Sequence, residues 1–240
     1  MTRRALVTGG SGALGEAICH ALAAGGLEVI VHANRRPAEA ERVAAEIRDE
    51  GGQARAVAFD VTDAAATRAA CEALTDERAV QVLVNNAGIH DDAPFVGMSR
   101  AQWDAVLDVS LNGFFNVTRP LALPMARTRW GRIVSIGSVA ATLGNRGQAN
   151  YAAAKGAVYA ASRTLALELG SRGVTVNAVA PGIIDSPMAS AAFDAASIAR
   201  MVPLQRAGRA TDVAALVAFL ASDAAGYITG QVVPIDGGMT

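Results

Sequence analysis

Tyr151 and Lys155 are the residues that most directly suggest chemistry, and they lie four positions apart in the alanine-rich segment "QANYAAAKGA". Side chains at this spacing project from the same face of a helix. An unperturbed phenol has a pKa of about 10, so it needs a nearby cation before it can exchange a proton near neutral pH. The pair therefore indicates proton transfer by Tyr151, although the same spacing also occurs in many helices that perform no chemistry.

Two polar stretches end the strands that are expected upstream of this pair. Ser138 closes "GRIVSIGS", thirteen residues before Tyr151, and "LVNNAG" places Asn85 and Asn86 at the end of another strand. An open parallel sheet binds its ligands at the carboxyl ends of its strands. Ser138 is therefore a candidate to hold a substrate carbonyl oxygen. Taken singly, a serine at a strand end is more often a loop or capping residue, and the asparagines are equally compatible with a structural turn.

The stretch "TGGSGALG" is a glycine-rich turn that can be divided in two ways. One division frames Gly10, Gly12 and Gly15, which is the general dinucleotide fingerprint, and the other starts at Thr8-Gly9. Between a strand and a helix, such a turn presents backbone N–H groups and the positive end of the helix dipole to a pyrophosphate. A tight turn that binds no ligand is the alternative.

The end of the second expected strand, "EVIVHANRRP", indicates whether the site takes an adenosine ribose with a free 2′-OH or with a 2′-phosphate. The acid that usually binds a ribose 2′-OH is missing there. The segment offers His32, Asn34, Arg35 and Arg36 instead, and two arginines suit a 2′-phosphate. This favours NADP over NAD, with a solvated pair of surface arginines as the alternative.

Short apolar runs alternate along the chain with longer helical patterns, which is typical of a parallel sheet with connecting helices. Helices are expected from about Ala13, Pro37 and Asp63, over "QWDAVLDVSLNGFFNV" and around Tyr151. The runs are nearly continuous in aliphatic residues, as in strands covered on both faces. We therefore predict one α/β domain over residues 1–240, a Rossmann-type doubly wound parallel sheet of about seven strands with helices on both faces. The expected strands are "RALVT", "EVIVHA", "ARAVAF", "VQVLVNN", "GRIVSIGS", "VTVNAVA" and "VVPID".

Composition narrows the class of protein. The 240 residues are 52% hydrophobic with a formal net charge of −1, so they bury a substantial core and create no global field for nucleic acid or anionic lipid. Cys19 and Cys71 lie in alanine-rich helical patterns, which suits packed free thiols and a reduced, cytoplasmic setting. We expect no membrane span, no nucleic-acid partner and no metal site. The irregular stretch 181–209 is typical of a substrate lid.

These motifs occur together in an order that is typical of one family. The chain resembles the short-chain dehydrogenase/reductases over essentially its whole length, and Ala13 stands where their Thr-Gly-x-x-x-Gly-x-Gly loop has its middle glycine. The matching motifs are Thr8-Gly9 to Gly15, Asp60-Val61, "NNAG" at 85–88, Asn112, Ser138, Tyr151, Lys155 and "PG" at 181–182. Within the family, "GRIVSIGSVAATLGNRGQANYAAAKG" and "ITGQVVPIDGGM" are most similar to the 3-oxoacyl-carrier-protein reductases of type II fatty acid synthesis.

The resemblance implies NADPH-dependent reduction of a 3-oxoacyl thioester. Tyr151 would be the proton donor, and Lys155 would lower its pKa and hold the nicotinamide ribose. Ser138 would polarise the ketone, and Asn112 would anchor a water relay to Lys155. Gly12 departs from the arginine common in NADP-using relatives, and Ser186 from the usual threonine. The implied NADP(H) contacts are Gly9, Ser11, Gly12, Leu14 and Gly15; Asn34, Arg35 and Arg36; Asp60 and Val61; Asn86, Ala87 and Gly88; Tyr151 and Lys155; and Pro181, Gly182, Ile184 and Ser186.

Partners also follow from the resemblance. Arg129 and Arg172 match positions that such reductases use to dock the acidic acyl-carrier protein, with solvated arginines at helix ends as the alternative. A homotetramer is expected, built on the helix of Tyr151 and on "GQVVPIDGG". Three other functions stay open: a reductase of a polyketide or aryl polyene pathway, a reductase of a small ketone, alcohol or sugar, and a nucleotide-binding scaffold without catalysis. The set of Asn112, Ser138, Tyr151 and Lys155 argues against the last.

Overall fold

A computed structural model describes residues 2–186 and 193–240. Seven parallel strands form one sheet in the order β3-β2-β1-β4-β5-β6-β7. The strands are β1 (Arg4–Val7), β2 (Glu28–Ala33), β3 (Gln53–Ala58), β4 (Val82–Asn85), β5 (Gly131–Ile136), β6 (Val174–Pro181) and β7 (Val232–Ile235). The prediction of a doubly wound parallel α/β sheet with about seven strands is confirmed.

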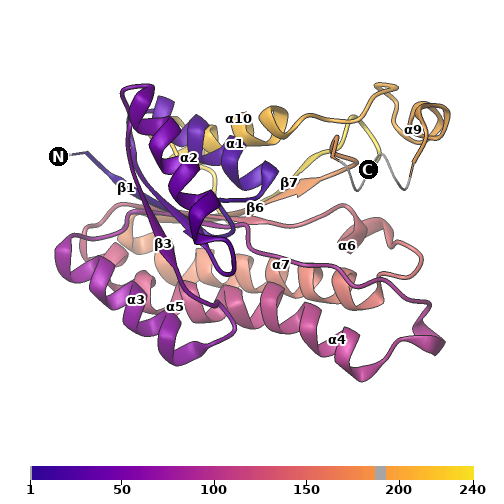
Figure 1. Cartoon of the computed structure of the whole chain (residues 1–240), viewed down its shortest axis with the longest axis horizontal. Helices are drawn as coiled ribbons and strands as arrows, with labels where there is room; N and C mark the ends of the chain where they lie inside the picture. Colours follow the sequence, from indigo (N-terminus) through magenta and orange to yellow (C-terminus); the bar gives the residue numbers. More distant parts are fainter. Residues whose placement is uncertain (1, 187–192) are drawn as a thin grey trace.

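Helices cover both faces of this sheet (Figure 1). One layer contains α1 (Ala13–Ala24), α2 (Pro37–Asp49) and α10 (Ala210–Leu220), and the other contains α3 (Ala64–Glu77), α4 (Arg100–Leu107), α5 (Gly113–Arg127) and α7 (Ala149–Leu169). The short helices are α6 (Ala140–Leu143) and α9 (Ala195–Met201). The predicted helix starts at Ala13 and Pro37 are confirmed, and Asp63 caps α3 by accepting the N–H groups of Ala65 and Ala66, both at 2.9 Å.

The strands separate two layers of core because successive side chains point to opposite faces. In β1, Ala5 and Val7 pack into the layer of α1, α2 and α10, whereas Leu6 packs into the other layer. Strands β1, β4, β5 and β6 are buried along their whole length. Burial on both faces explains why these runs show no alternation of apolar and polar residues.

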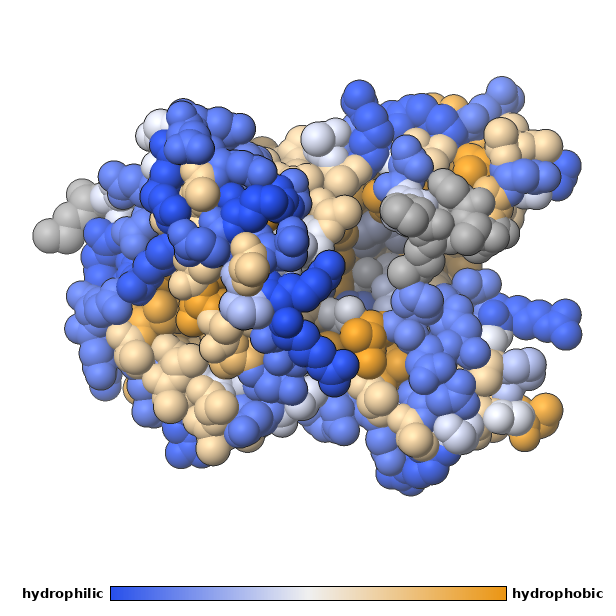
Figure 2. All heavy atoms as spheres, in the orientation of Figure 1, coloured by the Kyte–Doolittle hydropathy of each residue, from blue (hydrophilic) through white to orange (hydrophobic). Residues whose placement is uncertain are grey.

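The two halves of the sheet wind away from β1, which pairs with β2 on one side and with β4 on the other. At such a switch point the connecting helices leave a crevice at the carboxyl ends of the strands. Figure 2 shows the surface hollowed on the side of the molecule where α6 and α9 lie. The fold therefore places the ends of β1, β4, β5 and β6 at the rim of one crevice.

The long helical segment predicted over "QWDAVLDVSLNGFFNV" forms with one interruption. A single π-helical turn, Asp108–Asn112, joins α4 to α5. Such turns change which side chains point inward, and they occur often at functional sites. Ser110, inside this turn, is buried in the core. None of the described helices has the length and apolar character needed to cross a membrane.

Candidate active site

Hydrogen bonds to the end of β4 fix the glycine-rich turn. Thr8 Oγ1 accepts the N–H groups of Asn86 (2.9 Å) and Ala87 (3.0 Å). Asn86 Nδ2 in turn donates to the carbonyl oxygens of Thr8 (3.0 Å) and Gly9 (3.1 Å). The residues predicted at this rim therefore lie against the turn that starts α1.

Backbone geometry decides between the two divisions of the turn. Gly9 has a φ of +63°, and a β-carbon on Gly15 would stand 2.2 Å from Gly9 O, so both positions require glycine. A β-carbon on Gly12 would meet only Gly9 O, at 3.6 Å. Gly10 is also tight, because its β-carbon would stand 2.9 Å from Val31 Cγ1. The fold therefore requires Gly9, which only the second division includes, and has room for a side chain at Gly12, which belongs to the first.

This turn leaves the start of α1 open to an anion. Gly12 is the N-cap and offers no side chain to the helix terminus. The first N–H groups of a helix have no partner within the helix, and they carry the positive end of its dipole. Backbone amides and open space above Gly12 are what a pyrophosphate needs. The turn thus fits the phosphates of a dinucleotide.

His32 supports the same turn from β2. Its Nδ1 accepts the Gly9 N–H (3.1 Å), and its Nε2 lies 2.9 Å from Phe59 O. A carbonyl oxygen can only accept, so Nε2 carries the hydrogen and the ring is neutral. Burial lowers the pKa of His32, more than the Phe59 carbonyl and Asp60 raise it. Of the polar residues at the end of this strand, His32 is therefore a structural support.

The residues expected at the adenosine end lie together after β2 and β3. Asn34, Arg35 and Arg36 are exposed directly beyond β2. The Thr62 N–H, and to a lesser degree the Thr62 hydroxyl, the Asn34 amide and the Arg35 charge, hold the pKa of Asp60 below its ordinary value. Asp60 is thus beside Asn34 and Arg35, so the structure brings these three residues of the expected adenosine end together.

Ser138 and Tyr151 meet at the ends of β5 and α7. The Ser138 Oγ accepts the Ala140 N–H (3.1 Å), so its own hydrogen can go to an oxygen in the site. Burial raises the pKa of Tyr151, although a hydrogen bond with Ser138 lowers it, and Asp92 adds to the rise. Tyr151 therefore keeps its proton at neutral pH, as a proton donor must. Burial sets the direction of this pKa shift, in place of the lowering by Lys155 that the resemblance implies.

Lys155 is the only lysine in the sequence, and it is buried. Its Nζ donates to Ile136 O (2.9 Å) and lies 5.6 Å from the centroid of the Tyr151 ring. Burial lowers the pKa of Lys155 from 10.5 to about 8. An ammonium group has three donors, so Lys155 can also hold the hydroxyls of a ribose.

A small cavity lies beside Lys155. It has a volume of about 10 Å³, and Thr8, Asn85 and Ser110 are among its lining residues. The Ser110 hydroxyl is buried and has no hydrogen-bond partner within the described chain. A β-carbon on Gly88 would stand 3.3 Å from Lys155 Nζ and 3.5 Å from Ser110 Oγ, so both polar atoms face the same point. The volume matches that of one water molecule.

Asn112 does not line this cavity. Its Nδ2 donates to Asp108 Oδ1 (2.7 Å) on the exposed side of the π-helical turn. The structure therefore brings Ser138, Tyr151 and Lys155 together and places Ser110 where Asn112 was expected. The resemblance implies this role for Asn112, but the π turn decides which neighbour points inward, and no single residue in the sequence signals that turn.

The segment after β6 forms the other wall of the site. Pro181 ends β6, and a β-carbon on Gly182 would stand 2.7 Å from Asp236 Cβ, which requires glycine at this approach. Ile184 pairs with Gly208 in an isolated bridge. Ser186 is the last residue described before the gap, so residues 187–192 of the expected lid lie outside the described residues.

Arg129 and Arg172 are not at this rim. Both are exposed, and they precede β5 and β6, so they lie at the amino ends of the strands. Helix α7 carries Tyr151 near its start and ends at Leu169, and its 21 residues separate the two edges by roughly 30 Å. Within one chain, the arginines that were expected to dock a carrier thus lie opposite the crevice.

One group of side chains among the described residues has the geometry of metal ligands. It consists of Glu16, His20 and Glu46 on α1 and α2. Arg42 already binds this group, because it donates to both Glu16 and Glu46 at 2.7 Å. The group is therefore accounted for by ion pairs on the outer helices.

The fold and the site define a nicotinamide-dependent oxidoreductase, because a phosphate-binding turn meets a serine, a tyrosine and a buried lysine in one crevice. The chain belongs to the short-chain dehydrogenase/reductase family. A family model described as enoyl-(acyl carrier protein) reductase matches residues 10–240. The 3-oxoacyl-[acyl-carrier-protein] reductase of Synechocystis sp. is 45% identical over 237 residues, which are 98% of this chain and 96% of that protein.

Two other relatives have similar identity. The 3-oxoacyl-[acyl-carrier-protein] reductase FabG of Staphylococcus aureus is 43% identical over 242 residues, which cover 100% of this chain and 98% of that protein. Nodulation protein G of Rhizobium sp. is 44% identical over 239 residues, which cover 99% of this chain and 96% of that protein. The similarity of this chain to 3-oxoacyl-carrier-protein reductases, noted in its motifs, is confirmed.

Proposed function

We propose that this protein reduces the 3-oxo group of an acyl thioester on an acyl-carrier protein in fatty acid synthesis, with NADPH as the cofactor. One observation carries the proposal: Ser138, Tyr151 and Lys155 converge beside the phosphate-binding turn in a chain that is 45% identical to a 3-oxoacyl-carrier-protein reductase. The geometry supports the chemistry, and the relative supports the substrate.

The residues present fit NADP(H). The turn from Gly9 to Gly15 would hold the pyrophosphate, Arg35 and Arg36 the 2′-phosphate, and Lys155 the nicotinamide ribose. The cofactor would supply a hydride to the 3-oxo carbon. Arginine is suited to the phosphate because its planar fork gives paired hydrogen bonds to two oxygens.

Tyr151 supplies the proton in this proposal. The ketone oxygen gains negative charge as its carbon is reduced, and the hydroxyls of Ser138 and Tyr151 point donors at it before the reaction starts. The phenol then passes its proton to that oxygen. A raised pKa serves the reductive direction, since it keeps the proton on Tyr151 at neutral pH.

Lys155 returns a proton toward Tyr151. We place the water relay that was expected at Asn112 beside Ser110 instead, because the cavity of about 10 Å³ joins Ser110 to Lys155. A water there would accept from the ammonium and from the serine hydroxyl, which satisfies a buried polar group. Asn112, bonded to Asp108, has no direct part in this step.

Initial rates with a 3-oxoacyl thioester test the proposal, with the acyl group presented on a small thiol and on a carrier protein, and with NADPH and then NADH. The double variant Arg35→Ala/Arg36→Ala should raise KM for NADPH about 30-fold and leave KM for NADH unchanged, because only NADPH has the phosphate. Arg48→Ala, an exposed arginine of α2, is the matched control. Equal use of NADPH and NADH by the unaltered protein would contradict the cofactor assignment.

Charge reversal tests where the acidic carrier docks. Arg129→Glu/Arg172→Glu changes the amino edge of the sheet, and Arg146→Glu changes an exposed arginine between α6 and α7 at the crevice. The small-thiol substrate is the control, since it needs no docking. If only the first variant raises KM for the carrier substrate, the carrier docks across copies of the chain. If only Arg146→Glu does so, it docks at the rim of its own site.

A homotetramer is part of this proposal. Phe115 and Leu123 of α5 and Leu167 of α7 are large apolar side chains that are 58%, 59% and 86% exposed in one chain. Ala153 and Ala160 of α7 leave small exposed positions for the close approach of another helix. A second interface would form through "GQVVPIDGG". Sedimentation that shows a monomer at micromolar concentration would contradict this arrangement.

Each alternative function has its own outcome in the same assay. Fast turnover of a small ketone with slow turnover of both thioesters would indicate a reductase of small molecules. Selective use of a carrier from a polyketide or aryl polyene pathway would indicate that the protein acts in that pathway. NADPH binding without turnover of any ketone would indicate a scaffold. The buried thiols of Cys19 and Cys71 agree with a reduced, cytoplasmic setting.

A further inference from the structure

Helix α7 contains a second tyrosine at the site, two turns after Tyr151, and this one is buried. Tyr159 is 6% exposed. Its hydroxyl accepts the Ser138 N–H at 2.8 Å and donates to the Ser138 carbonyl oxygen at 2.8 Å. One side-chain group therefore satisfies both main-chain polar groups of the serine that faces the substrate.

The end of the sheet explains why Ser138 needs such a partner. Its neighbours Gly137 and Val139 donate to Val179 O (2.7 Å) and Pro181 O (3.0 Å) of β6. Alternate residues of a central strand pair to opposite sides, so the polar groups of Ser138 face the side of β4. Strand β4 ends at Asn85, opposite Ser135. The Tyr159 hydroxyl thus takes the place of a strand that has already ended.

Gly137 and Tyr159 are shaped for each other. A β-carbon on Gly137 would stand 2.2 Å from both the Cε1 and the hydroxyl oxygen of Tyr159. The ring also packs with Val139, Ala178 and Ala180. Burial raises the pKa of Tyr159 to about 12, so its hydroxyl remains both a donor and an acceptor at any working pH. Ring and hydroxyl are therefore held in one position.

We propose that Tyr159 is a positioning residue for the reduction: it fixes the main chain of Ser138 so that the serine hydroxyl stays aimed at Tyr151 and at the ketone oxygen. This inference rests on the proposed function for its chemistry. It differs from a packing role, because a phenylalanine would fill the same volume without holding Ser138.

The groups that face Tyr151 allow a specific readout. The Ser138 hydrogen bond lowers the pKa of Tyr151, Asp92 raises it, and the ammonium of Lys155 lies over its ring. Asp92 and Lys155 are bonded elsewhere and would stay in place if Ser138 moved. Loss of the Tyr159 hydroxyl should therefore weaken only the hydrogen bond from Tyr151 to Ser138. Because that bond lowers the pKa of Tyr151, its weakening should raise this pKa.

The test is a double-mutant cycle with Tyr159→Phe and Ser138→Ala. Turnover is expressed per NADPH-binding site, so a partly unfolded preparation lowers the number of sites and leaves kcat unaffected. Tyr159→Phe should lower kcat about tenfold, keep Kd for NADPH within about twofold, and shift the pH profile of alcohol oxidation upward. In the Ser138→Ala background, Tyr159→Phe should have almost no further effect, because the group that it positions is gone.

Ser162→Ala is the matched control, since it removes another buried hydroxyl from α7 and should leave kcat and the pH profile unchanged. Two effects that multiply in the cycle, or an unchanged pH profile, would overturn the proposal. If Tyr159→Phe yields no NADPH-binding sites, Gly137→Ala replaces it, because the added methyl displaces the ring and should cause the same loss of kcat. A small ketone in place of the thioester separates failure of this inference from failure of the proposed substrate.

Discussion

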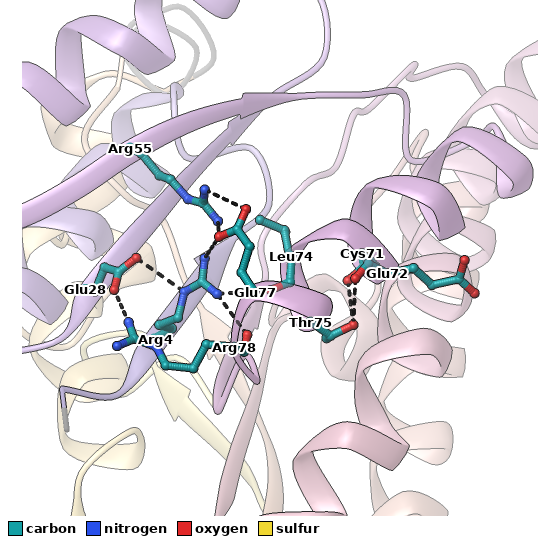
Figure 3. Close-up of polar contacts among 9 residues, drawn as sticks. All are labelled: Arg4, Glu28, Arg55, Cys71, Glu72, Leu74, Thr75, Glu77 and Arg78. Atoms are coloured by element: carbon teal, nitrogen blue, oxygen red, sulfur yellow. Dashed lines mark hydrogen bonds and ion pairs between the residues drawn. The ribbon is translucent and has the colours of Figure 1, made fainter.

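Buried cations lie at both edges of the sheet, Arg4 and Arg132 at the amino edge and Lys155 at the carboxyl edge, and the structure surrounds Arg4 and Lys155 differently. Arg4 opens β1 at the amino edge and is 2% exposed. Its guanidinium donates to the carbonyl oxygens of Leu74 (3.0 Å) and Arg78 (2.8 Å) and meets the carboxylates of Glu77 (3.1 Å) and Glu28 (3.3 Å), as Figure 3 shows. The amino edge thus surrounds Arg4 with acceptors.

At the carboxyl edge, Lys155 is almost as buried but meets far fewer acceptors. It is 4% exposed and donates to Ile136 O. Burial lowers its pKa to about 8, which means that its charge is costly. At the amino edge, hydrogen bonds and charge from Arg55, and then from Arg4, hold the pKa of Glu77 below its ordinary value, so the charges there stabilise one another.

This contrast distinguishes a structural charge from a functional one. A buried ion with many partners is costly to remove, because the partners are left unpaired, whereas one with few partners reduces stability and keeps its donors for a ligand. The choice of side chain agrees with this distinction. Lys155 is the only lysine in the sequence, and every other residue of the Lys and Arg types is arginine. Lysine can release its proton when it is buried, and arginine retains it.

Lys155→Met is the largest expected change in turnover. The variant should lower the single-turnover rate by roughly 10³-fold, because proton transfer by Tyr151 loses the neighbouring cation. NADPH binding should weaken as well, so the rate is measured at saturating cofactor. Arg4→Met, at the other edge, should retain the rate of the unaltered protein below its melting temperature. A Lys155→Met rate within tenfold of the original would contradict the functional assignment of this cation.

Arg4→Met should instead lower stability by about 2–4 kcal/mol. It removes the side-chain donor from the carbonyl oxygens of Leu74 and Arg78, and it leaves Glu28 and Glu77 with only their bonds to Arg78 and Arg55. Urea unfolding measures the change. Arg4→Lys keeps the charge but loses the planar fork, so the stability of this variant should lie between those of Arg4→Met and the unaltered protein. A loss of stability below about 0.5 kcal/mol would show that the Arg4 network contributes no more than an exposed surface ion pair.

The sequence predicted the carboxyl edge much better than the amino edge. Parallel strands had to bring Thr8, Asn86 and Ser138 to one rim, and helical spacing had to bring Tyr151 and Lys155 together. Arg4 and its partners lie far apart in sequence, and their pairing depends on strand register. Ser110 and Tyr159 were missed for a related reason: a π turn aims the first, and the early end of β4 gives the second its partner.

Lys155→Met should raise the stability of the protein, whereas Arg4→Met lowers it, and the gain should be present only at lower pH. The folded-state pKa of Lys155, about 8, lies below its ordinary value of 10.5, so the unfolded chain binds more protons between these limits. Stability of the unaltered protein therefore rises with pH through this range, and the full penalty applies below pH 8. At pH 7, Lys155→Met should be more stable by roughly 1–3 kcal/mol, with the difference vanishing near pH 10.5.

Urea unfolding of the cofactor-free protein at pH 7 and at pH 10 measures this difference. Because the chain has one lysine, lysine labelled with ¹³C at Cε gives one signal for that side chain, and its titration reports the pKa directly. A titration near 10.5, or a variant less stable than the original at pH 7, would place Lys155 with Arg4 as a satisfied structural charge.

Ser110→Ala gives the smallest effect and the finest distinction. If the unpartnered hydroxyl is only a packing defect, its removal should be neutral or slightly stabilising and should leave turnover unchanged. If it holds a water against Lys155, turnover should fall about tenfold while NADPH binding persists, since one hydrogen bond of the relay is lost. Ser162→Ala is the control, because that hydroxyl is also buried without a partner in the described chain but does not line the cavity. Equal turnover of the two variants would mean that Lys155 exchanges its proton by another route. The free N–H donors of Lys155 would then serve only to bind the cofactor.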